Sequence, residues 1–175
     1  GRYNVYYSGE GVVNKKIDDY LIRSYGSYFR ADVLGLKAGS YTITVSPVIG
    51  GVEAPGATTS TLTVLPHDRN GFAFANGRVP GGYKADGTPK DNAVIIYIKK
   101  KRKNTVAYDV VTNNKGNTTN HVGFQNIISG IKKGDENRPF IFRLVGNITD
   151  FATMEGGDIV LENKNNTNSH ITVEG

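Results

Sequence analysis

The 175-residue sequence contains no cysteine, no tryptophan and a single methionine. The lack of cysteine excludes disulfide frameworks and thiolate metal sites. No stretch approaches the ~20 consecutive apolar residues of a membrane-spanning helix, and Gly1 does not open a signal peptide. Glycine is instead abundant, and threonine and tyrosine are well represented, which favours a chain that is mostly β.

The charge is mildly positive, at +5, and it is unevenly distributed. Residues 1–66 contain six lysines and arginines against five acidic residues, whereas residues 67–175 contain fifteen against eleven. A polyanionic partner is therefore permitted but not required. The dense basic run Lys99–Lys103 suggests such a partner, but five like charges without aromatic residues between them are more typical of a solvated edge that blocks aggregation. We therefore expect no nucleic-acid partner.

Residues 1–66 predict an antiparallel β-sandwich. Tyr3, Val5 and Tyr7 occupy every second position, which is the period of a half-buried strand. Several short strands separated by turn-forming residues indicate a sandwich. We expect strands at Arg2–Tyr7, Tyr28–Val33, Tyr41–Pro47 and Thr58–Val64.

This region resembles a fibronectin type III domain. The matching parts are Tyr3–Tyr7 and the corner Leu36–Tyr41, followed by the strand Thr42–Ser46. The resemblance implies that the hydroxyl of Tyr41 bonds to nearby backbone and pins two strands. The first two strands of such a domain have no counterpart, so we expect an incomplete sandwich. Seven of the ten tyrosines lie in the first 41 residues. Core packing explains most of them, although exposed tyrosines could stack on sugar rings.

Residues 67–92 predict a connecting loop, because Phe72–Lys90 is rich in glycine, proline, asparagine and aspartate and shows little periodicity. After this loop, Val94–Ile98 and Thr105–Val110 predict two apolar strands. We expect them to pair as a hairpin with the basic run Lys99–Lys103 at its tip.

An amphipathic helix is predicted at Gly123–Lys133. Its apolar residues recur at i, i+3, i+4 and i+7 and form one stripe: Phe124, Ile127, Ile128 and Ile131. Phe140–Val145 follows as a nearly continuous apolar run, which predicts a strand covered on both faces. A helix that covers one end of such a strand suggests a parallel β architecture with a helical cap.

Two further short strands are predicted at Asp158–Glu162 and His170–Glu174, joined by the polar bridge Asn163–Ser169. Short apolar strands between asparagine and glycine corners suit the coils of a parallel β-helix, in which each turn stacks on the last. A bare last coil leaves an open edge. We therefore expect the edge strands near both termini to pair with another chain or to be covered by loops.

Residues 93–175 resemble the N-terminal part of a bacterial pectate lyase of polysaccharide lyase family one. The helix, Arg138–Ile148 and Ser169–Gly175 carry the resemblance, with Val145–Ile148 and His170–Gly175 in the places of the family's Val/Ser-Gly-x-Ile and Thr-Ile-x-Gly elements. The resemblance implies a mostly β chain in which an incomplete sandwich is followed by a hairpin, a capping helix and the first coils of a right-handed parallel β-helix.

This family cleaves de-esterified pectin by β-elimination with calcium, so the resemblance implies calcium for the full-length lyase and none for this fragment. The family's calcium carboxylates and catalytic arginine belong to later coils, beyond Gly175, and we assign no catalytic, cofactor-binding or metal-binding residue here. Arg143 lies in a strand predicted to be buried and suits an ion pair or a capping contact better than a base. The nearby acidic residues are separated and suit solvated corners better than a calcium site: Asp150, Glu155, Asp158, Glu162 and Glu174.

Two functions stay open. The first is the non-catalytic N-terminal part of a secreted bacterial polysaccharide lyase, extracellular, at the cell surface or periplasmic, whose full-length form acts on pectate. The second is a stand-alone glycan-binding or adhesion module without enzymatic activity, in which tyrosines or the Lys99–Lys103 run bind an acidic glycan. His67, His121 and His170 are isolated in sequence and fit no catalytic or metal-binding pattern.

Overall fold

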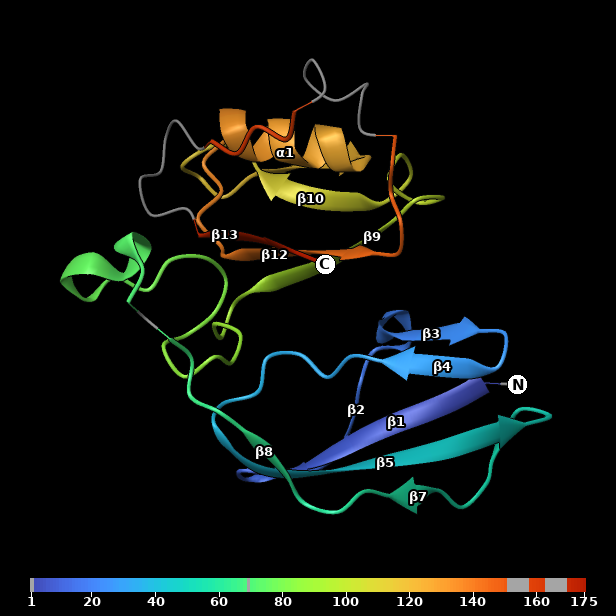
Figure 1. Ribbon diagram of the computed structural model, residues 1–175. Helices are drawn as coiled ribbons and strands as arrows, with labels where there is room; N and C mark the ends of the chain where they lie inside the picture. The colour runs from blue at the N-terminus through green and yellow to red at the C-terminus, as the bar shows by residue number, and fades with distance from the viewer. Residues whose placement is uncertain (1, 69, 151–157, 163–169) are drawn as a thin grey trace. The chain divides into compact units, whose positions relative to one another are not determined.

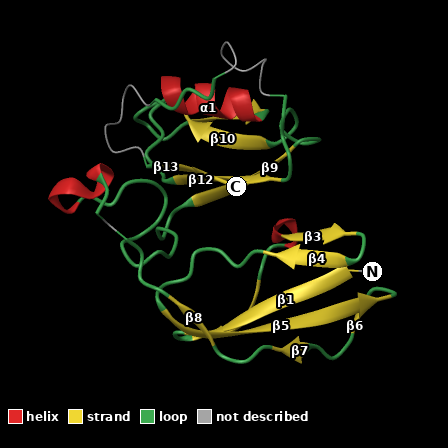
Figure 2. Cartoon of the chain, in the orientation of Figure 1, coloured by secondary structure: helices red, strands yellow, loops and turns green. Residues whose placement is uncertain are grey.

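The computed structural model describes residues 2–68, 70–150, 158–162 and 170–175. Over these residues the chain is mostly β and contains one α-helix (Figure 1, Figure 2), which confirms the fold class at this level. The chain divides into two compact units. The first is Gly1–Asn76 with Lys84–Thr88, and the second is Gly77–Tyr83 with Pro89–Gly175.

The first unit is built on two long antiparallel strands, β1 (Arg2–Gly9) and β5 (Gly39–Ile49), which pair from Arg2 with Val48 to Gly9 with Tyr41. Both strands lie where the sequence pattern predicts them. The predicted strand Thr58–Val64 is instead two short strands separated by three residues. Shorter strands complete the sheet: β2 (Val12–Lys16) beside β1, and β6 (Val52–Glu53), β7 (Ala57–Thr58) and β8 (Leu62–Val64) beside β5.

A separate hairpin of the first unit follows the 3-10 turn η1 (Asp19–Leu21) and consists of β3 (Ile22–Tyr25) and β4 (Tyr28–Ala31). Phe29 of β4 stacks on Tyr3 of β1 with ring centroids 4.3 Å apart, and this contact attaches the hairpin to the sheet. The corner tyrosine forms the expected bond, because the Tyr41 hydroxyl donates to the carbonyl of Lys37 at 2.8 Å.

The second unit contains a three-stranded parallel sheet with β12 in the middle. Its strands are β9 (Val94–Lys99), β12 (Phe140–Val145) and β13 (Ile171–Glu174). Phe140 pairs with Val94 on one side and with Ile171 on the other. Phe140, Ile141 and Phe142 are each 0% exposed, which confirms a strand covered on both faces.

The helix α1 (Phe124–Lys133) lies where the apolar stripe predicts it, and this stripe packs into a core that it shares with the parallel sheet. The Phe124 ring lies 5.1 Å from the Phe142 ring. Full burial of each large apolar side chain stabilises a fold by roughly 1.5–3 kcal/mol, so this core is a major source of the second unit's stability. The core includes the four residues of the helical stripe with Ile96, Ile98, Val106, Val110, Phe140 and Phe142.

The predicted hairpin between Val94–Ile98 and Thr105–Val110 is wrong. Both strands form, but β9 pairs with β12, while β10 (Ala107–Val111) pairs with β11 (Thr118–Val122). The cause is the basic run between them, which folds into successive tight turns. Within it the Lys103 N–H donates to the Lys99 carbonyl and the Val106 N–H donates to the Arg102 carbonyl, each at 2.8 Å. These turns carry the chain out of the parallel sheet, so β9 and β10 belong to different sheets.

Two other predicted segments also differ from the structure. Asp158–Glu162 forms no strand, and it contributes Ile159 to the edge of the core instead. The predicted loop Phe72–Lys90 contains η2 (Phe72–Gly77), two short 3-10 turns joined at a kink. The loop also contains an isolated antiparallel bridge between Tyr83 and Pro89.

Candidate functional site

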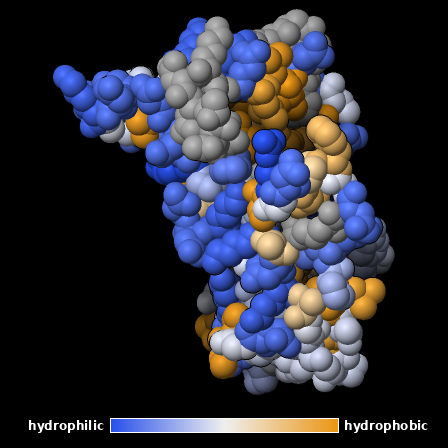
Figure 3. Space-filling view, turned by 90° about the vertical axis from the view of Figure 1, so that its left-hand side faces the viewer, coloured by the Kyte–Doolittle hydropathy of each residue, from blue (hydrophilic) through white to orange (hydrophobic). Residues whose placement is uncertain are grey.

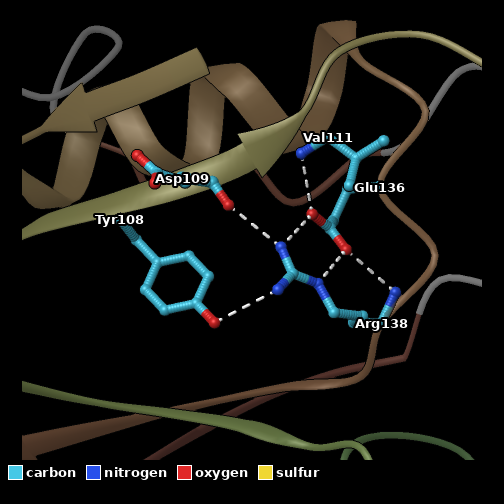
Figure 4. Close-up of polar contacts among 5 residues, drawn as sticks. All are labelled: Tyr108, Asp109, Val111, Glu136 and Arg138. Atoms are coloured by element: carbon cyan, nitrogen blue, oxygen red, sulfur yellow. Dashed lines mark hydrogen bonds and ion pairs between the residues drawn. The ribbon is translucent and has the colours of Figure 1, made fainter. Parts of the chain in front are cut away.

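A buried ion pair holds the chain just before β12. Glu136 is 1% exposed and accepts hydrogen bonds from the Arg138 side chain, Nε to Oε1 and Nη2 to Oε2, both at 2.8 Å (Figure 4). The backbone N–H groups of Val111 and Arg138 donate to the same carboxylate at 2.9 and 3.0 Å. Burial alone raises the pKa of the Glu136 carboxyl, but the hydrogen bonds from Arg138 and from the two backbone groups outweigh it and the net pKa is lowered.

The same arginine reaches the β10 strand. Its Nη2 donates to the carbonyl of Asp109 at 2.9 Å and its Nη1 donates to the hydroxyl of Tyr108 at 3.2 Å. The guanidinium carbon lies 5.2 Å from the centroid of the Tyr108 ring. Since most of its donors are already used, Arg138 ties β10 to the start of β12 and keeps little capacity for a ligand.

A pocket of about 410 Å³ lies beside this pair, on the β10–β11 hairpin. Its wall includes Asp109, whose carboxylate accepts a hydrogen bond from the Asn120 side chain at 2.8 Å. With Arg138 neutralised by Glu136, the carboxylate of Asp109 leaves the pocket with excess negative charge. The pocket therefore disfavours an acidic ligand.

A second buried cluster surrounds Arg143 on the opposite face of β12 from the core. Arg143 is 5% exposed, and its Nε donates to Glu174 Oε1 at 2.7 Å. Its Nη1 donates to the Tyr97 hydroxyl at 2.8 Å and its Nη2 to the Tyr83 hydroxyl at 3.3 Å. The Tyr83 hydroxyl in turn donates to Glu174 at 2.5 Å. These contacts link all three strands of the parallel sheet to the loop that carries Tyr83.

The charges of this second cluster fix the role of Arg143. Burial lowers the pKa of the guanidinium, but hydrogen bonds to Tyr83 and Glu174 more than offset this, and the pKa of Arg143 is raised. Burial, together with the bond to Glu174, raises the pKa of Tyr83 to about 12. Arg143 therefore stays protonated and forms the ion pair that the sequence indicates, not a proton-abstracting base.

The structure does not bring together the acidic residues considered for calcium. Asp150 pairs with Lys103 at 3.1 Å, Glu162 pairs with Lys132 at 3.3 Å, and Glu174 pairs with Arg143. Asp158 is exposed, and Glu155 lies outside the described residues. Among the residues that the structure describes, no three acidic or histidine side chains gather as they do around a bound metal.

The three histidines occupy separate places. His67 lies against Gly87 in the first unit, and His121 packs on Gly130 of α1. His170 stands just before β13, where burial lowers its pKa. Within the described parts of the chain, none of them belongs to a group of three or more histidine or acidic side chains that could hold a metal ion.

The exposed candidate for ligand binding in the second unit is the basic turn, which we define as Lys99–Lys103. Lys100, Lys101 and Arg102 are exposed, whereas Lys103 is paired with Asp150. The turn is held firmly, because the Phe124 N–H at the start of α1 donates to the Lys103 carbonyl at 2.7 Å. The exposed lysines Lys100 and Lys101 form a compact positive surface on this turn.

Figure 3 shows one face of the chain, where hydrophilic residues predominate and hydrophobic residues lie in separate groups. Over the described residues, no helix is long and apolar enough to cross a membrane. Comparisons with protein-family models, with curated proteins and with solved structures found no match.

Proposed function

We propose that this chain is the non-catalytic N-terminal part of a secreted polysaccharide lyase of the pectate lyase type, and that it binds the acidic polysaccharide. The observation that carries the proposal is the stacking of the parallel strands. β9, β12 and β13 have the same order along the chain and across the sheet, with β10, β11 and α1 inserted between β9 and β12. Successive coils of a parallel β-helix produce this order, since each coil adds one strand beside the previous one.

The helix α1 supports the same architecture. Its apolar stripe packs on Phe140 and Phe142, the residues of β12 that face away from Arg143. In a β-helix, a helix in this place closes the apolar interior of the first coils and keeps it from water. In the first unit, the bond from Tyr41 to Lys37 supports a relation to fibronectin type III domains, where a tyrosine pins the corner in this way.

A non-catalytic role is supported by the pairing of the charged groups. β-Elimination from a uronate needs a metal to neutralise the carboxylate and a base to take the proton at the adjacent carbon. Arg138 and Arg143 are each committed to a buried glutamate or to a partner on the neighbouring strand. Glu162 and Asp150 are likewise paired with lysines. Binding of an acidic polysaccharide is compatible with this pairing, because the basic turn presents cations to solvent.

The test measures cleavage and binding of polygalacturonate by the same preparation. Incubation with calcium at alkaline pH, followed by the absorbance of the unsaturated product, should show no turnover. Titration calorimetry should show binding that weakens steeply with added salt, because exposed charges are screened over about 10 Å at 0.1 M ionic strength. Turnover that a chelator abolishes, or no binding at low salt, would refute the proposal.

A matched pair of variants locates the charge. Lys100→Ser with Lys101→Ser removes two cations from the basic turn, and should weaken binding about thirtyfold, since each cation at an anionic surface contributes on the order of 1 kcal/mol. Lys15→Ser with Lys115→Ser removes the same charge from two other exposed positions and should leave the affinity within about twofold. Equal effects of the two pairs would show that net charge, not the turn, governs binding.

A further inference from the structure

The β3–β4 hairpin of the first unit presents two arginines and two tyrosines on one face. In its register Arg23 lies opposite Arg30, and Tyr25 lies opposite Tyr28. Because side chains alternate along a strand, these four share one face and Phe29 lies on the other. The Phe29 face is occupied by the stack on Tyr3. The face with the two arginines is turned outward: Tyr28 is 65% exposed and the side chain of Arg30 is 63% exposed.

The aromatic part of this face is held together by contacts among its own side chains. The rings of Tyr25 and Tyr28 are stacked, with centroids 5.1 Å apart and planes inclined by 15°. The guanidinium carbon of Arg23 lies 5.2 Å from the centroid of the Tyr25 ring. Only two residues separate the strands, and Gly26 takes a positive φ of 33° in that turn. A short hairpin of this kind holds its rings with little freedom, so little conformational entropy is lost when they bind.

The charge of this face is unbalanced. Like charges directly opposite one another on a sheet are unfavourable, yet Arg23 and Arg30 stand in such a pair. Asp32 binds Arg30, with Nε to Oδ1 at 2.8 Å, and no carboxylate among the described residues is within ion-pair distance of Arg23. Two guanidinium groups with one carboxylate leave an excess of positive charge that a ligand carboxylate matches.

We propose that Arg23, Tyr25, Tyr28 and Arg30 form a binding surface for a segment of acidic polysaccharide. The exposed ring of Tyr28 stacks on the C–H face of a sugar, and a guanidinium binds the uronate carboxylate beside it. Residues two apart on a strand are about 6.6 Å apart, so the ring and the guanidinium groups can contact one sugar and its neighbour. This inference rests on the proposed function for the polymer, but it places binding on a surface of the first unit.

Single-stranded nucleic acid would be the other polymer with rings and negative charge, and the geometry favours the polysaccharide. Rings with centroids 5.1 Å apart leave no room for a base between them. Nucleic-acid binding uses successive bases stacked on separate aromatic side chains. A sugar needs only one exposed ring face and a cation at its edge.

The experiment uses the full chain and oligogalacturonate of defined length, with affinities from titration calorimetry. Tyr28→Ala should weaken binding about five- to tenfold, and Tyr28→Phe, which keeps the ring, should stay within about twofold. Arg23→Gln should weaken binding of oligogalacturonate but leave that of its methyl ester unchanged, because the ester has no carboxylate. Phe72→Ala, at a position 97% exposed, and Arg2→Gln are the matched controls and should have no effect.

The outcomes separate this surface from the proposed function. If the chain binds oligogalacturonate and neither Tyr28→Ala nor Arg23→Gln alters the affinity, the surface is refuted and the proposed function stands. If the chain does not bind at all, the proposed function fails, and this inference fails with it. Tighter binding of oligothymidylate than of oligogalacturonate would overturn the assignment to polysaccharide. Arg23→Gln removes the charge and keeps a long polar side chain and both rings, so it tests the surface even if Tyr28→Ala perturbs the hairpin.

Discussion

The buried pair of Glu136 and Arg138 gives the sharpest prediction for stability. Arg138→Leu removes the guanidinium that pairs with the Glu136 carboxylate, which is 1% exposed. Breaking one side of a buried ion pair costs about 3–5 kcal/mol. We expect the lower end, about 3 kcal/mol, since the Arg138 side chain is itself 30% exposed.

A double-mutant cycle measures the interaction free energy between Glu136 and Arg138. Glu136→Gln keeps the size of the side chain but removes its charge, and should cost about 1.5–3 kcal/mol through weakened hydrogen bonds. The double variant should be less destabilised than the sum of the two, by about 0.5–3 kcal/mol, because each single change already breaks the interaction. Lys16→Met breaks an exposed pair with Asp19 and is the control, expected to cost under ~1 kcal/mol.

Urea denaturation followed by far-UV circular dichroism measures these free energies, and hydrogen exchange locates the effect. The amide of Val111 donates to Glu136, so it should exchange faster in both single variants than in the unaltered chain. The reasoning is refuted if Arg138→Leu costs no more than Lys16→Met. It is also refuted if the amide of Val111 is equally protected in every variant.

Three further predictions concern the stability of the second unit at low pH, the titration of the Tyr83 hydroxyl and the hydrogen bond of Tyr41 at the corner of the first unit. The pKa of the Glu136 carboxyl is lowered on folding, so this group stabilises the fold above its unfolded pKa of about 4.3. The contribution is lost as the pH falls through the folded pKa. Lowering the pH should therefore destabilise the unaltered chain more than Glu136→Gln. The pKa of Tyr83 is raised to about 12, so its contribution is full below pH ~10 and is lost as the pH rises toward 12; Tyr83→Phe should remove the late-titrating phenol from the absorbance at 295 nm, and an unchanged curve would contradict the assignment. Tyr41→Phe deletes the bond to the Lys37 carbonyl and should cost about 0.5–1.5 kcal/mol in urea denaturation, whereas no loss would show that packing alone fixes the corner.

Periodicity correctly predicts the segments whose own apolar residues require burial. α1 and β12 lie within one residue of their predicted bounds, because an apolar stripe or run must be buried whatever covers it. β2 and β11 have no such signal. Val12–Lys16 is largely exposed, and Thr118–Val122 is polar. Both form strands because a neighbouring strand offers backbone groups to pair with, and the pattern of their own side chains does not predict a strand.

Which strands pair with one another is not predicted by the sequence pattern. Val94–Ile98 and Thr105–Val110 are both correct as strands, yet adjacency along the chain suggests a hairpin that does not form. The turns within Lys99–Val106 decide the outcome, and no glycine or proline marks them. The side-chain contacts of the buried clusters are likewise not predicted by the sequence pattern. Arg143 is predicted as an ion pair from its strand alone, but its contacts with Tyr83 and Tyr97 span the whole second unit and depend on a register that periodicity does not specify.

The arginines of this chain serve two opposite purposes, and the difference is exposure. Arg138 and Arg143 each donate most of their N–H groups to carboxylates, hydroxyls or, for Arg138, a carbonyl, and these partners compete with any ligand. Arg23 and Arg30 share one outward face with a tyrosine that is 65% exposed. Desolvating a carboxylate ligand is repaid only where the cation still has donors to offer. The binding of an acidic polymer that we propose therefore involves the exposed hairpin and the basic turn, while the buried arginines hold strands together.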